Sequence, residues 1–309
     1  MSVLITGGAG FLGSALANRL VAQGSHVRVL DDLSAGERER LDPRVAFCSG
    51  DTRDIPKLWS LLRGVDCVYH LAARVSVPES VLYPVEYNDV NVGGTVSLLT
   101  AMRDAQVKRL VFASSGAIYG EQERQPIAED APLRPLTPYA VSKVASEQYV
   151  RAIGNLWGIE TVILRIFNAY GPGQPLPPSH ASVIPRFLKQ ATSGGSLVVF
   201  GDGTQTRDFV YIDDVVDALV AAGQAEGISR SIINIGSGRE VSIGELVETI
   251  ERVLGESVHR LCASGEKAGV TRLVADVDLA RRTLGYTPRV SLEEGLQRTI
   301  ARDGRFSPR

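Results

Sequence analysis

The stretch Gly7-Gly8-Ala9-Gly10-Phe11-Leu12-Gly13 follows the apolar run Val3-Leu4-Ile5-Thr6 at the start of the chain. Glycines at positions 7, 10 and 13, placed between a strand and a helix, let the backbone turn tightly and approach a pyrophosphate. The dipole of the following helix favours such an anion at its N-terminus. A glycine loop can also be an ordinary turn. The stretch therefore indicates a dinucleotide-binding fold that other parts of the chain must support.

The second predicted strand supports this interpretation, because it ends in Asp31-Asp32 about 20 residues downstream of the loop. A carboxylate there accepts hydrogen bonds from the adenosine ribose and repels a 2'-phosphate. This favours NAD over NADP. Three nearby arginines, of the kind that bind a 2'-phosphate, keep NADP open as the alternative: Arg28, Arg38 and Arg40.

Short apolar runs alternate with amphipathic stretches in the first half of the chain, which predicts an α/β fold with a Rossmann-type doubly wound parallel sheet. The predicted strands are 3–6, 26–30, 45–48, 67–71, 109–113 and 160–166. The predicted helices are 11–23, 55–62, 84–105 and 138–157.

The alternation breaks after Asn168, where the Pro- and Gly-rich residues 171–178 predict a long loop. We therefore predict an NAD-binding domain over residues 1–168 and a smaller α/β substrate-binding lobe over 169–309, with segments free to cross between them. The predicted strands of the second half are 197–200, 209–212 and 232–235. Its predicted helices are 184–192, 215–225, 243–254, 279–284 and 292–301.

Ser115, Tyr139 and Lys143 form the candidate catalytic set. Ser115 follows the fifth predicted strand, and the Tyr-x-x-x-Lys pair lies on one face of the helix predicted at 138–157. A Tyr beside a Lys ammonium and a cationic nicotinamide ring is expected to have its pKa lowered from about 10, which makes it a usable base. A surface helical pair is the simpler alternative for Tyr139 and Lys143, but the serine and the glycine loop in register argue against it.

Composition excludes several classes of function. The 33 Lys+Arg nearly balance the 35 Asp+Glu, so no basic field is available to hold nucleic acid or an anionic membrane. The first residues show no charged segment followed by an apolar one, and no apolar stretch reaches about 18 residues, so we expect neither secretion nor a membrane span. Three widely spaced cysteines favour a reducing cytoplasm, and four scattered histidines predict no metal site.

Several further segments resemble those of the extended short-chain dehydrogenase/reductases, in their nucleotide-sugar epimerase/dehydratase branch. They are His70-Leu71-Ala72-Ala73, 88–94 with Asn91, 164–173 and 205–214. The resemblance covers nearly the whole chain. It implies an NAD held throughout turnover, and a sugar nucleotide, most simply a UDP-sugar, across the cleft between the lobes.

The resemblance also assigns roles residue by residue. Expected at the cofactor are Gly7, Gly10, Phe11, Leu12, Gly13, Asp31, Asp32, Ser34, Gly36, Asp51, Thr52, Leu71, Ala72, Ala73, Asn91, Ala113, Tyr139, Lys143 and Phe167. Expected at the substrate are Val77, Ser115, Gly116, Asn168, Ser182, Val183, Val199, Phe200, Arg207, Phe209 and Arg272. Among these, Arg207 is expected to bind a phosphate oxygen, for which an Arg suits through bidentate bonds. Asp51 has an equally good interpretation as a helix N-cap or turn residue.

One segment departs from the family pattern. Family members usually carry Arg-x-Gly-Asp about nine residues before the pair found here as Ala275-Asp276, and this chain has Glu266-Lys267-Ala268-Gly269-Val270 instead. The family's second phosphate-binding Arg is therefore missing. Arg272 or Lys267 can replace it, or can equally be a solvated loop charge.

The residues after Ser115 help to choose among the branch's reactions. Dehydratases place Asp-Glu there and decarboxylases a Glu, but this chain has Gly116-Ala117. What remains is 4-epimerisation through a transient 4-ketosugar, with UDP-glucose/UDP-galactose as the first expectation and N-acetyl, uronate and dTDP-sugar substrates open. The alternatives are a 4-ketoreductase, a dehydratase and a non-catalytic NAD(P)-sensing protein.

The resemblance also suggests a homodimer, in which the helices predicted at 84–105 and 138–157 pair with their symmetry mates as a four-helix bundle. The apolar positions expected on this face are Val96, Leu99, Val144, Tyr149 and Ile153.

Overall fold

Seven parallel strands form the central sheet of the computed structural model, which describes residues 1–177, 181–263 and 270–306. Their order is β11-β6-β5-β4-β1-β2-β3. The strands are β1 (Ser2–Thr6), β2 (His26–Asp31), β3 (Ala46–Ser49), β4 (Cys67–His70), β5 (Arg109–Ser115), β6 (Glu160–Ile166) and β11 (Ser231–Ile235). The predicted doubly wound parallel sheet is confirmed.

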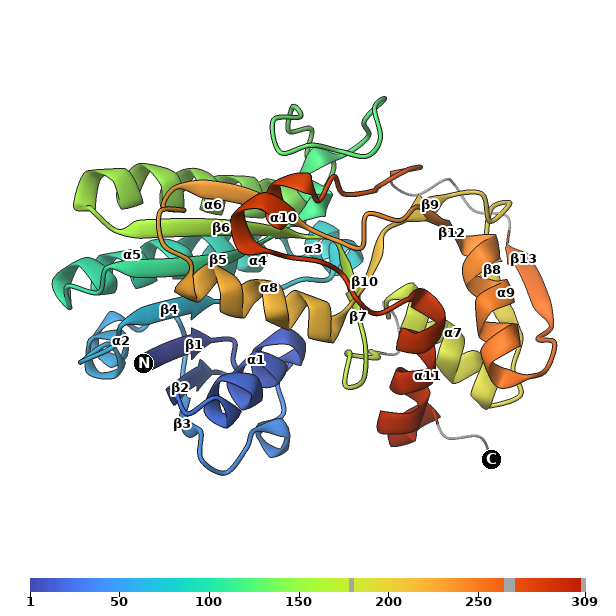
Figure 1. Ribbon diagram of the computed structural model, residues 1–309, viewed down its shortest axis with the longest axis horizontal. Coiled ribbons are helices and arrows are strands. Elements are labelled where there is room, and N and C mark those ends of the chain that lie inside the picture. Colours follow the sequence, from blue (N-terminus) through green and yellow to red (C-terminus); the bar gives the residue numbers. More distant parts are fainter. Residues whose placement is uncertain (178–180, 264–269, 307–309) are drawn as a thin grey trace.

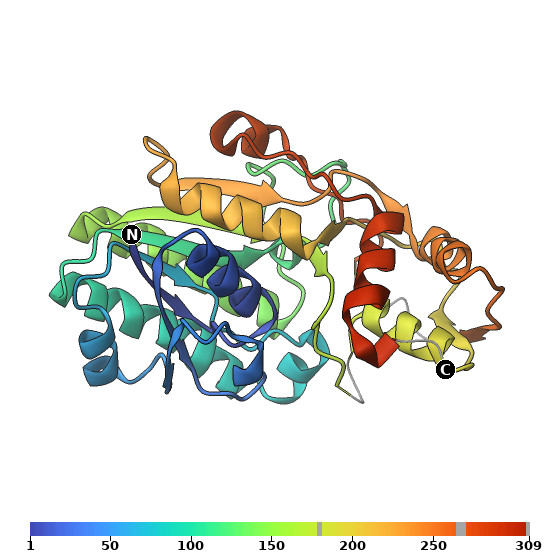
Figure 2. The same ribbon diagram turned by 60° about the horizontal axis from the view of Figure 1, so that its bottom comes forward.

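Helices cover both faces of this sheet (Figures 1 and 2). On one face, α2 (Ile55–Leu61), α5 (Gly94–Asp104) and α6 (Pro138–Trp157) pack against alternate strand residues such as Leu4 and Phe112. On the other, α1 (Phe11–Ala22) and α8 (Ile212–Gln224) pack against each other and against Val3 and Ile5. Strand residues of both parities are buried, as expected for a parallel sheet covered on both sides.

The glycine loop lies at the point where the strand order reverses, with β2 and β3 on one side of β1 and β4, β5 and β6 on the other. β1 pairs with β2 on one side and with β4 on the other. In open α/β sheets, ligands bind in the crevice at the carboxyl ends of the strands at such a point. The glycine loop after β1, residues 71–73 after β4 and the last residue of β5, Ser115, all lie at this edge.

The smaller lobe lies at the other end of the molecule (Figure 1). Its paired strands are β7 (Asn168–Tyr170) with β10 (Phe209–Tyr211), β8 (Leu197–Phe200) with β13 (Arg260–Ala263), and β9 (Thr206–Arg207) with β12 (Val241–Ser242). Its helices are α7 (Val183–Thr192), α9 (Ile243–Leu254) and α11 (Leu292–Arg302). The remaining short helices are η1 (Arg38–Arg40), α3 (Val77–Leu82), α4 (Pro84–Tyr87), η3 (Gly116–Tyr119), α10 (Asp278–Leu284) and η4 (Gly304–Phe306).

Two expectations about these elements are corrected. The strand predicted at 232–235 belongs to the central sheet as β11, paired with β6, and the preceding helix α8 covers that sheet. The chain therefore crosses to the smaller lobe and back before it ends. The single helix predicted over 84–105 is α4 followed by the π-helical segment η2 (Asn88–Gly93) and α5. The domain boundary at residue 168 stays a prediction.

No helix in the described parts of the chain combines the length and the apolar character needed to cross a bilayer.

Candidate active site

The glycine loop packs tightly against the segment that follows β4. Gly7 has a φ of +68°, and a Cβ atom there would lie 2.6 Å from the backbone nitrogen of Ala72. At Gly13 a Cβ atom would lie 2.1 Å from the carbonyl oxygen of Gly7. At Gly10, by contrast, the only close atom is 3.3 Å away, so packing within the chain does not require a glycine there. Gly10 is also the N-cap of α1 and provides no capping side chain, which leaves an open helix N-terminus of the kind that fits a diphosphate.

Asp31, at the end of β2, is buried beside this loop. Its carboxylate accepts hydrogen bonds from the backbone nitrogens of Ala9 (2.9 Å) and Leu33 (2.8 Å). Burial raises its pKa, and these backbone donors act in the opposite direction. The carboxylate is thus fixed at the position where a ribose is expected. Asp32 is exposed and accepts hydrogen bonds from the backbone and hydroxyl of Ser34.

The arginines that kept NADP open have other partners. Arg28 donates to the carbonyl oxygens of Leu61 and Arg63. Arg40 pairs with Glu37 and donates to the carbonyl of Gly173. The remaining one, Arg38, lies over the Phe47 ring at 5.2 Å. These contacts favour NAD over NADP.

A buried polar chain connects the strand ends to the catalytic helix. His70 contacts the hydroxyls of Thr6 through Nδ1 (2.6 Å) and Thr95 through Nε2 (3.0 Å), and burial lowers its pKa to about 3, so it is neutral. Thr95 donates to the carbonyl of Asn91 (2.6 Å), and the Asn91 side chain donates to Ser142 of α6 (2.9 Å). Asn91, expected at the cofactor, therefore has a positioning role in this structure.

Asp51 and Phe167, two further residues expected at the cofactor, have contacts within the chain. Asp51 is bound by the guanidinium and backbone of Arg53, which agrees with a turn residue rather than a free adenine ligand. Phe167 is buried, and its ring lies 6.2 Å from that of Tyr119. Two glycines pack closely against expected cofactor residues: a Cβ atom on Gly36 would lie 2.8 Å from the Asp31 carboxylate, and one on Gly94 would lie 2.5 Å from the Thr52 hydroxyl.

Ser115, Tyr139 and Lys143 are brought together by β5 and α6. Ser115 ends β5, and its hydroxyl accepts a hydrogen bond from the backbone of Ala117 (3.2 Å). Helix α6 begins after Thr137, whose hydroxyl caps the backbone of Ala140, and Pro138 follows at a position that needs no N–H donor. Tyr139 and Lys143 both lie on the buried face of α6.

Burial dominates the electrostatics of this set. It raises the pKa of Tyr139, and interaction with the Ser115 side chain acts in the opposite direction. The expected lowering of this pKa by Lys143 together with a cationic nicotinamide ring stays a prediction. Burial also lowers the pKa of Lys143 to about 8, while Glu147 raises it, and the ammonium lies 4.7 Å from the centre of the Phe112 ring. Lys143 is mainly protonated at neutral pH.

Sequence reasoning missed the pair Glu147–Arg165, which lies one helical turn beyond Lys143. The side chain of Arg165 is only 4% exposed and binds both carboxylate oxygens of Glu147 at 3.1 and 2.9 Å. It also donates to the Tyr119 hydroxyl (2.8 Å), which in turn donates to Asn234 of β11 (2.7 Å). A charged residue four positions after the lysine was the available signal, but its partner on β6 was not.

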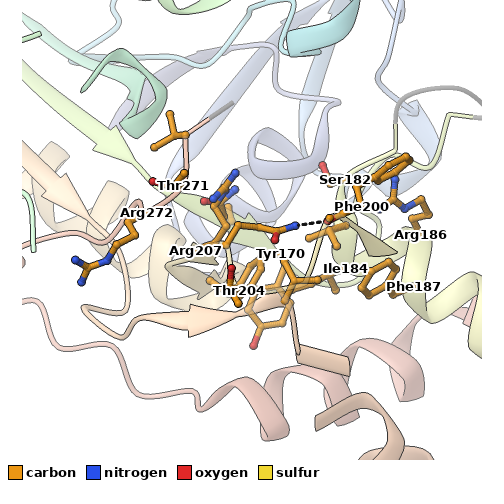
Figure 3. A pocket seen from close by; sticks show the side chains of 18 of the residues that line it. Tyr170, Ser182, Ile184, Arg186, Phe187, Phe200, Thr204, Arg207, Thr271 and Arg272 are labelled. Atoms are coloured by element: carbon orange, nitrogen blue, oxygen red, sulfur yellow. Dashed lines mark hydrogen bonds between the residues drawn. The ribbon is translucent and has the colours of Figure 1, made fainter. Parts of the chain in front are cut away.

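A cavity of about 820 Å³ lies in the smaller lobe next to β7 (Figure 3). Of the residues expected at the substrate, seven line it: Asn168, Ser182, Val183, Phe200, Arg207, Phe209 and Arg272. Val199 is instead packed in the core, and Val77 begins α3 outside this lining. Gly116 and Ser115 lie at the catalytic edge, where a Cβ atom on Gly116 would contact the ring of Phe167, the neighbour of Asn168.

The family model described as "NAD dependent epimerase/dehydratase family" matches residues 3–236. The chain belongs to this family. A UDP-glucose 4-epimerase of Mycolicibacterium smegmatis is 39% identical over 97% of this chain and 97% of its own. The structure also resembles the UDP-glucose 4-epimerase of Thermotoga maritima with UDP-glucose (TM-score 0.93, 34% identity, covering 97% and 98% of the two chains). It is also similar to the structure of the Thermus thermophilus UDP-glucose 4-epimerase with NAD (TM-score 0.89, 35% identity, covering 97% of this chain and 98% of that one).

Because the chain lacks the family's Arg-x-Gly-Asp element, another residue must supply the second phosphate-binding cation if the chain has one. Residues 264–269, and with them Lys267, lie outside the described residues. Arg272 is described, and it binds both oxygens of Glu240 at 2.7 and 2.8 Å. Its side chain is directed away from Arg207 (Figure 3). The expected replacement by Arg272 is therefore not favoured by the structure.

Proposed function

We propose that this protein is an NAD-dependent nucleotide-sugar 4-epimerase that acts on a UDP-sugar of the UDP-glucose/UDP-galactose type. The observation that carries the proposal is the placement of Ser115, Tyr139 and Lys143 beside the glycine loop, at the carboxyl edge of the sheet. The named activities of the relatives and the UDP-glucose and NAD in their structures support the same conclusion.

The glycine loop and Asp31 would hold the dinucleotide, the first at its diphosphate and the second at its ribose hydroxyls. When bound, NAD supplies a reversible hydride acceptor and a cationic nicotinamide ring. Tyr139 would take the proton from the sugar's 4-hydroxyl, and Ser115 would orient that hydroxyl by a hydrogen bond. Because burial raises the pKa of Tyr139, its phenolate needs nearby positive charge, which protonated Lys143 can provide. Once the hydride lost from C4 has returned on the opposite face of the sugar ring, return of the same proton from Tyr139 to O4 would complete epimerisation without a further acid or base.

Glu121 is the first acidic residue after Ser115, and its contacts also favour epimerisation over dehydration. Expulsion of a C6 hydroxyl needs an acid and a base near the sugar. Gly116 and Ala117 provide neither, and the carboxylate of Glu121 is bound to the backbone (2.7 Å) and hydroxyl of Thr271. Glu121 is thus engaged in holding a loop of the smaller lobe.

The test is incubation of the purified protein with a panel of nucleotide sugars, without added cofactor, followed by chromatographic separation of the C4 epimers. We expect interconversion of UDP-glucose and UDP-galactose and release of NAD on denaturation. Stoichiometric consumption of NAD(P)H with a ketosugar would instead establish the 4-ketoreductase. Absence of any turnover with NAD still bound would favour the sensing protein.

We also propose that two copies associate through α4, η2, α5 and α6. Large apolar side chains are exposed on α4, on α6 and on α3, which packs on α6. They are Val81, Leu82, Val85, Val141, Tyr149 and Leu156. A face of this kind typically marks an interface, and a self-complementary one is expected in a twofold dimer. Leu99 was wrongly expected there, because this residue of α5 is fully buried in the core.

We further propose a cytoplasmic location, in line with three unpaired cysteines.

A further inference from the structure

Two arginines that line the cavity of the smaller lobe form no ion pair with a carboxylate in the described part of the chain. Arg186 and Arg207 both line it, and neither forms an ion pair with any residue that the structure describes. Arg207 donates to the carbonyl of Thr206 (2.7 Å), and the Nε atom of Arg186 is buried without an acceptor within the same described ranges. Burial lowers the pKa of both groups, and the charge of the Glu121 carboxylate acts in the opposite direction on Arg207 only. An uncompensated, half-buried cation is unfavourable unless an anion binds to it.

The position of Arg186 in helix α7 makes this cost larger. The helix begins at Val183, and no side chain caps its N-terminus, so Arg186 lies at the end of the first turn. The partial positive charge of a helix N-terminus disfavours a cation there and favours an anion. Ser182 and Val183, which begin the helix, line the same cavity. The helix end and the arginine therefore attract the same kind of ligand.

Aromatic side chains hold the guanidinium of Arg186 in place. Its Cζ lies 5.3 Å from the centre of the Phe187 ring and 5.5 Å from that of Phe200 (Figure 3). Stacking of this kind fixes the plane of a guanidinium and leaves its edge for hydrogen bonds. The side chain is thus arranged before any ligand arrives.

We propose that Arg186 binds the diphosphate of the nucleotide sugar together with Arg207, and so supplies the second cation that the family places in its Arg-x-Gly-Asp element. This rests on the function proposed above. Arg272 is a poor candidate, because Glu240 binds it through two hydrogen bonds and is itself held by the Thr206 hydroxyl (2.7 Å). Two arginines without carboxylate partners match two adjacent phosphate groups in charge.

The experiment is a calorimetric titration of UDP and of uridine into wild-type protein and three variants: Arg186→Met, Arg207→Met and Arg252→Met. Methionine keeps the apolar stem that packs on Phe187 and Phe200. Arg252 is the matched control, since it is an exposed arginine of the same lobe, paired with Glu293 on the surface. We expect UDP affinity to fall about 10 to 150-fold for Arg186→Met and for Arg207→Met. Uridine affinity is expected to change far less, and Arg186→Lys should lie between wild type and Arg186→Met.

The unfolding temperature gives an independent reading. Without nucleotide, Arg186→Met should unfold at the same temperature as wild type or higher, because an uncompensated cation is removed. Its stabilisation by saturating UDP should be smaller than that of wild type. A variant that is merely misfolded would instead lose stability in both conditions.

The outcomes separate this inference from the proposed function. If wild type binds UDP, and Arg207→Met weakens binding but Arg186→Met does not, the role of Arg186 is wrong and the function stands. An equal loss for UDP and uridine would place Arg186 at the nucleoside and also overturn the proposal. If wild-type protein binds neither UDP nor UDP-glucose, the proposed function itself fails.

Discussion

Tyr139 is the residue on which the proposed chemistry depends most directly. Replacing it by Phe removes the hydroxyl that accepts the proton but keeps the ring that packs in the buried face of α6. We expect kcat to fall by roughly 10² to 10⁴-fold, the usual contribution of general base catalysis, with the bound NAD content unchanged. The measurement is epimer separation after timed incubation. Ser115→Ala should lower the rate in the same direction but less, and turnover near that of wild type in Tyr139→Phe would remove it as the base.

Lys143 should make the stability of the protein without cofactor depend on pH. Its pKa is lowered from 10.5 to about 8 by burial. Between these values the unfolded chain binds more protons at this site than the folded one, so the unfolding free energy rises with pH. Lys143→Met should therefore be more stable than wild type at pH 7, by on the order of 3 kcal/mol at most, since one pKa unit equals about 1.36 kcal/mol.

This difference should shrink as pH rises from 8 toward 10.5. Urea unfolding of both proteins across this range measures it, and comparing the two cancels the other groups that titrate there. A gap that does not change with pH would mean that Lys143 is not held at a lowered pKa.

At the scale of elements, the Glu147–Arg165 pair connects α6 to β6 and, through Tyr119, to β11. Arg165→Met alone leaves a fully buried carboxylate without its partner, and we expect a loss of about 3 to 5 kcal/mol in unfolding free energy. The double variant Glu147→Met with Arg165→Met removes both charges and should recover most of it. Chemical denaturation of the single and double variants measures the coupling; additive losses would show that the pair is not a unit.

The elements that sequence could predict are those with a strong local pattern. Strand β1, the glycine loop and α6 with its Tyr and Lys are continuous segments whose spacing carries their chemistry. Strands β9 and β12 have two residues each, which is too short for any periodicity to appear. The strand at 231–235 was predicted as a strand but not as a neighbour of β6, because a buried apolar run does not encode which sheet it joins.

In the site, the roles of two arginines depend on contacts with residues far away in the sequence, which the sequence alone does not show. Arg272 was a reasonable phosphate ligand until Glu240, on a separate loop, was found to bind it. Arg186 was overlooked, because an arginine within an amphipathic helix has the same local pattern whether it faces solvent or a cavity. Its place in the first turn, where a cation is disfavoured, was the one local signal.

At the scale of the whole molecule, the proposed dimer can be tested directly. We expect light scattering at micromolar concentration to give twice the mass of the 33.2 kDa chain. Val85→Glu places a charge in the exposed apolar face of α4 and should yield monomers, since burying an unpaired carboxylate opposes association. The control is Leu261→Glu, an exposed apolar position on β13 of the smaller lobe. A wild-type monomer, or a dimer unaffected by Val85→Glu, would contradict this interface.

The position of β11 has a consequence for how the chain is made. Among the described strands β11 pairs with β6 alone; β6 ends at Ile166 and β11 begins at Ser231, 65 positions later. At a synthesis rate of about 5 to 20 residues per second, this interval lasts roughly 3 to 13 seconds. During that time β6 is the outermost strand of a nascent sheet, with unpaired backbone groups that invite the wrong partner. We therefore expect the unpaired edge of β6 to need protection, for example by a chaperone, while residues 167–230 are being synthesised.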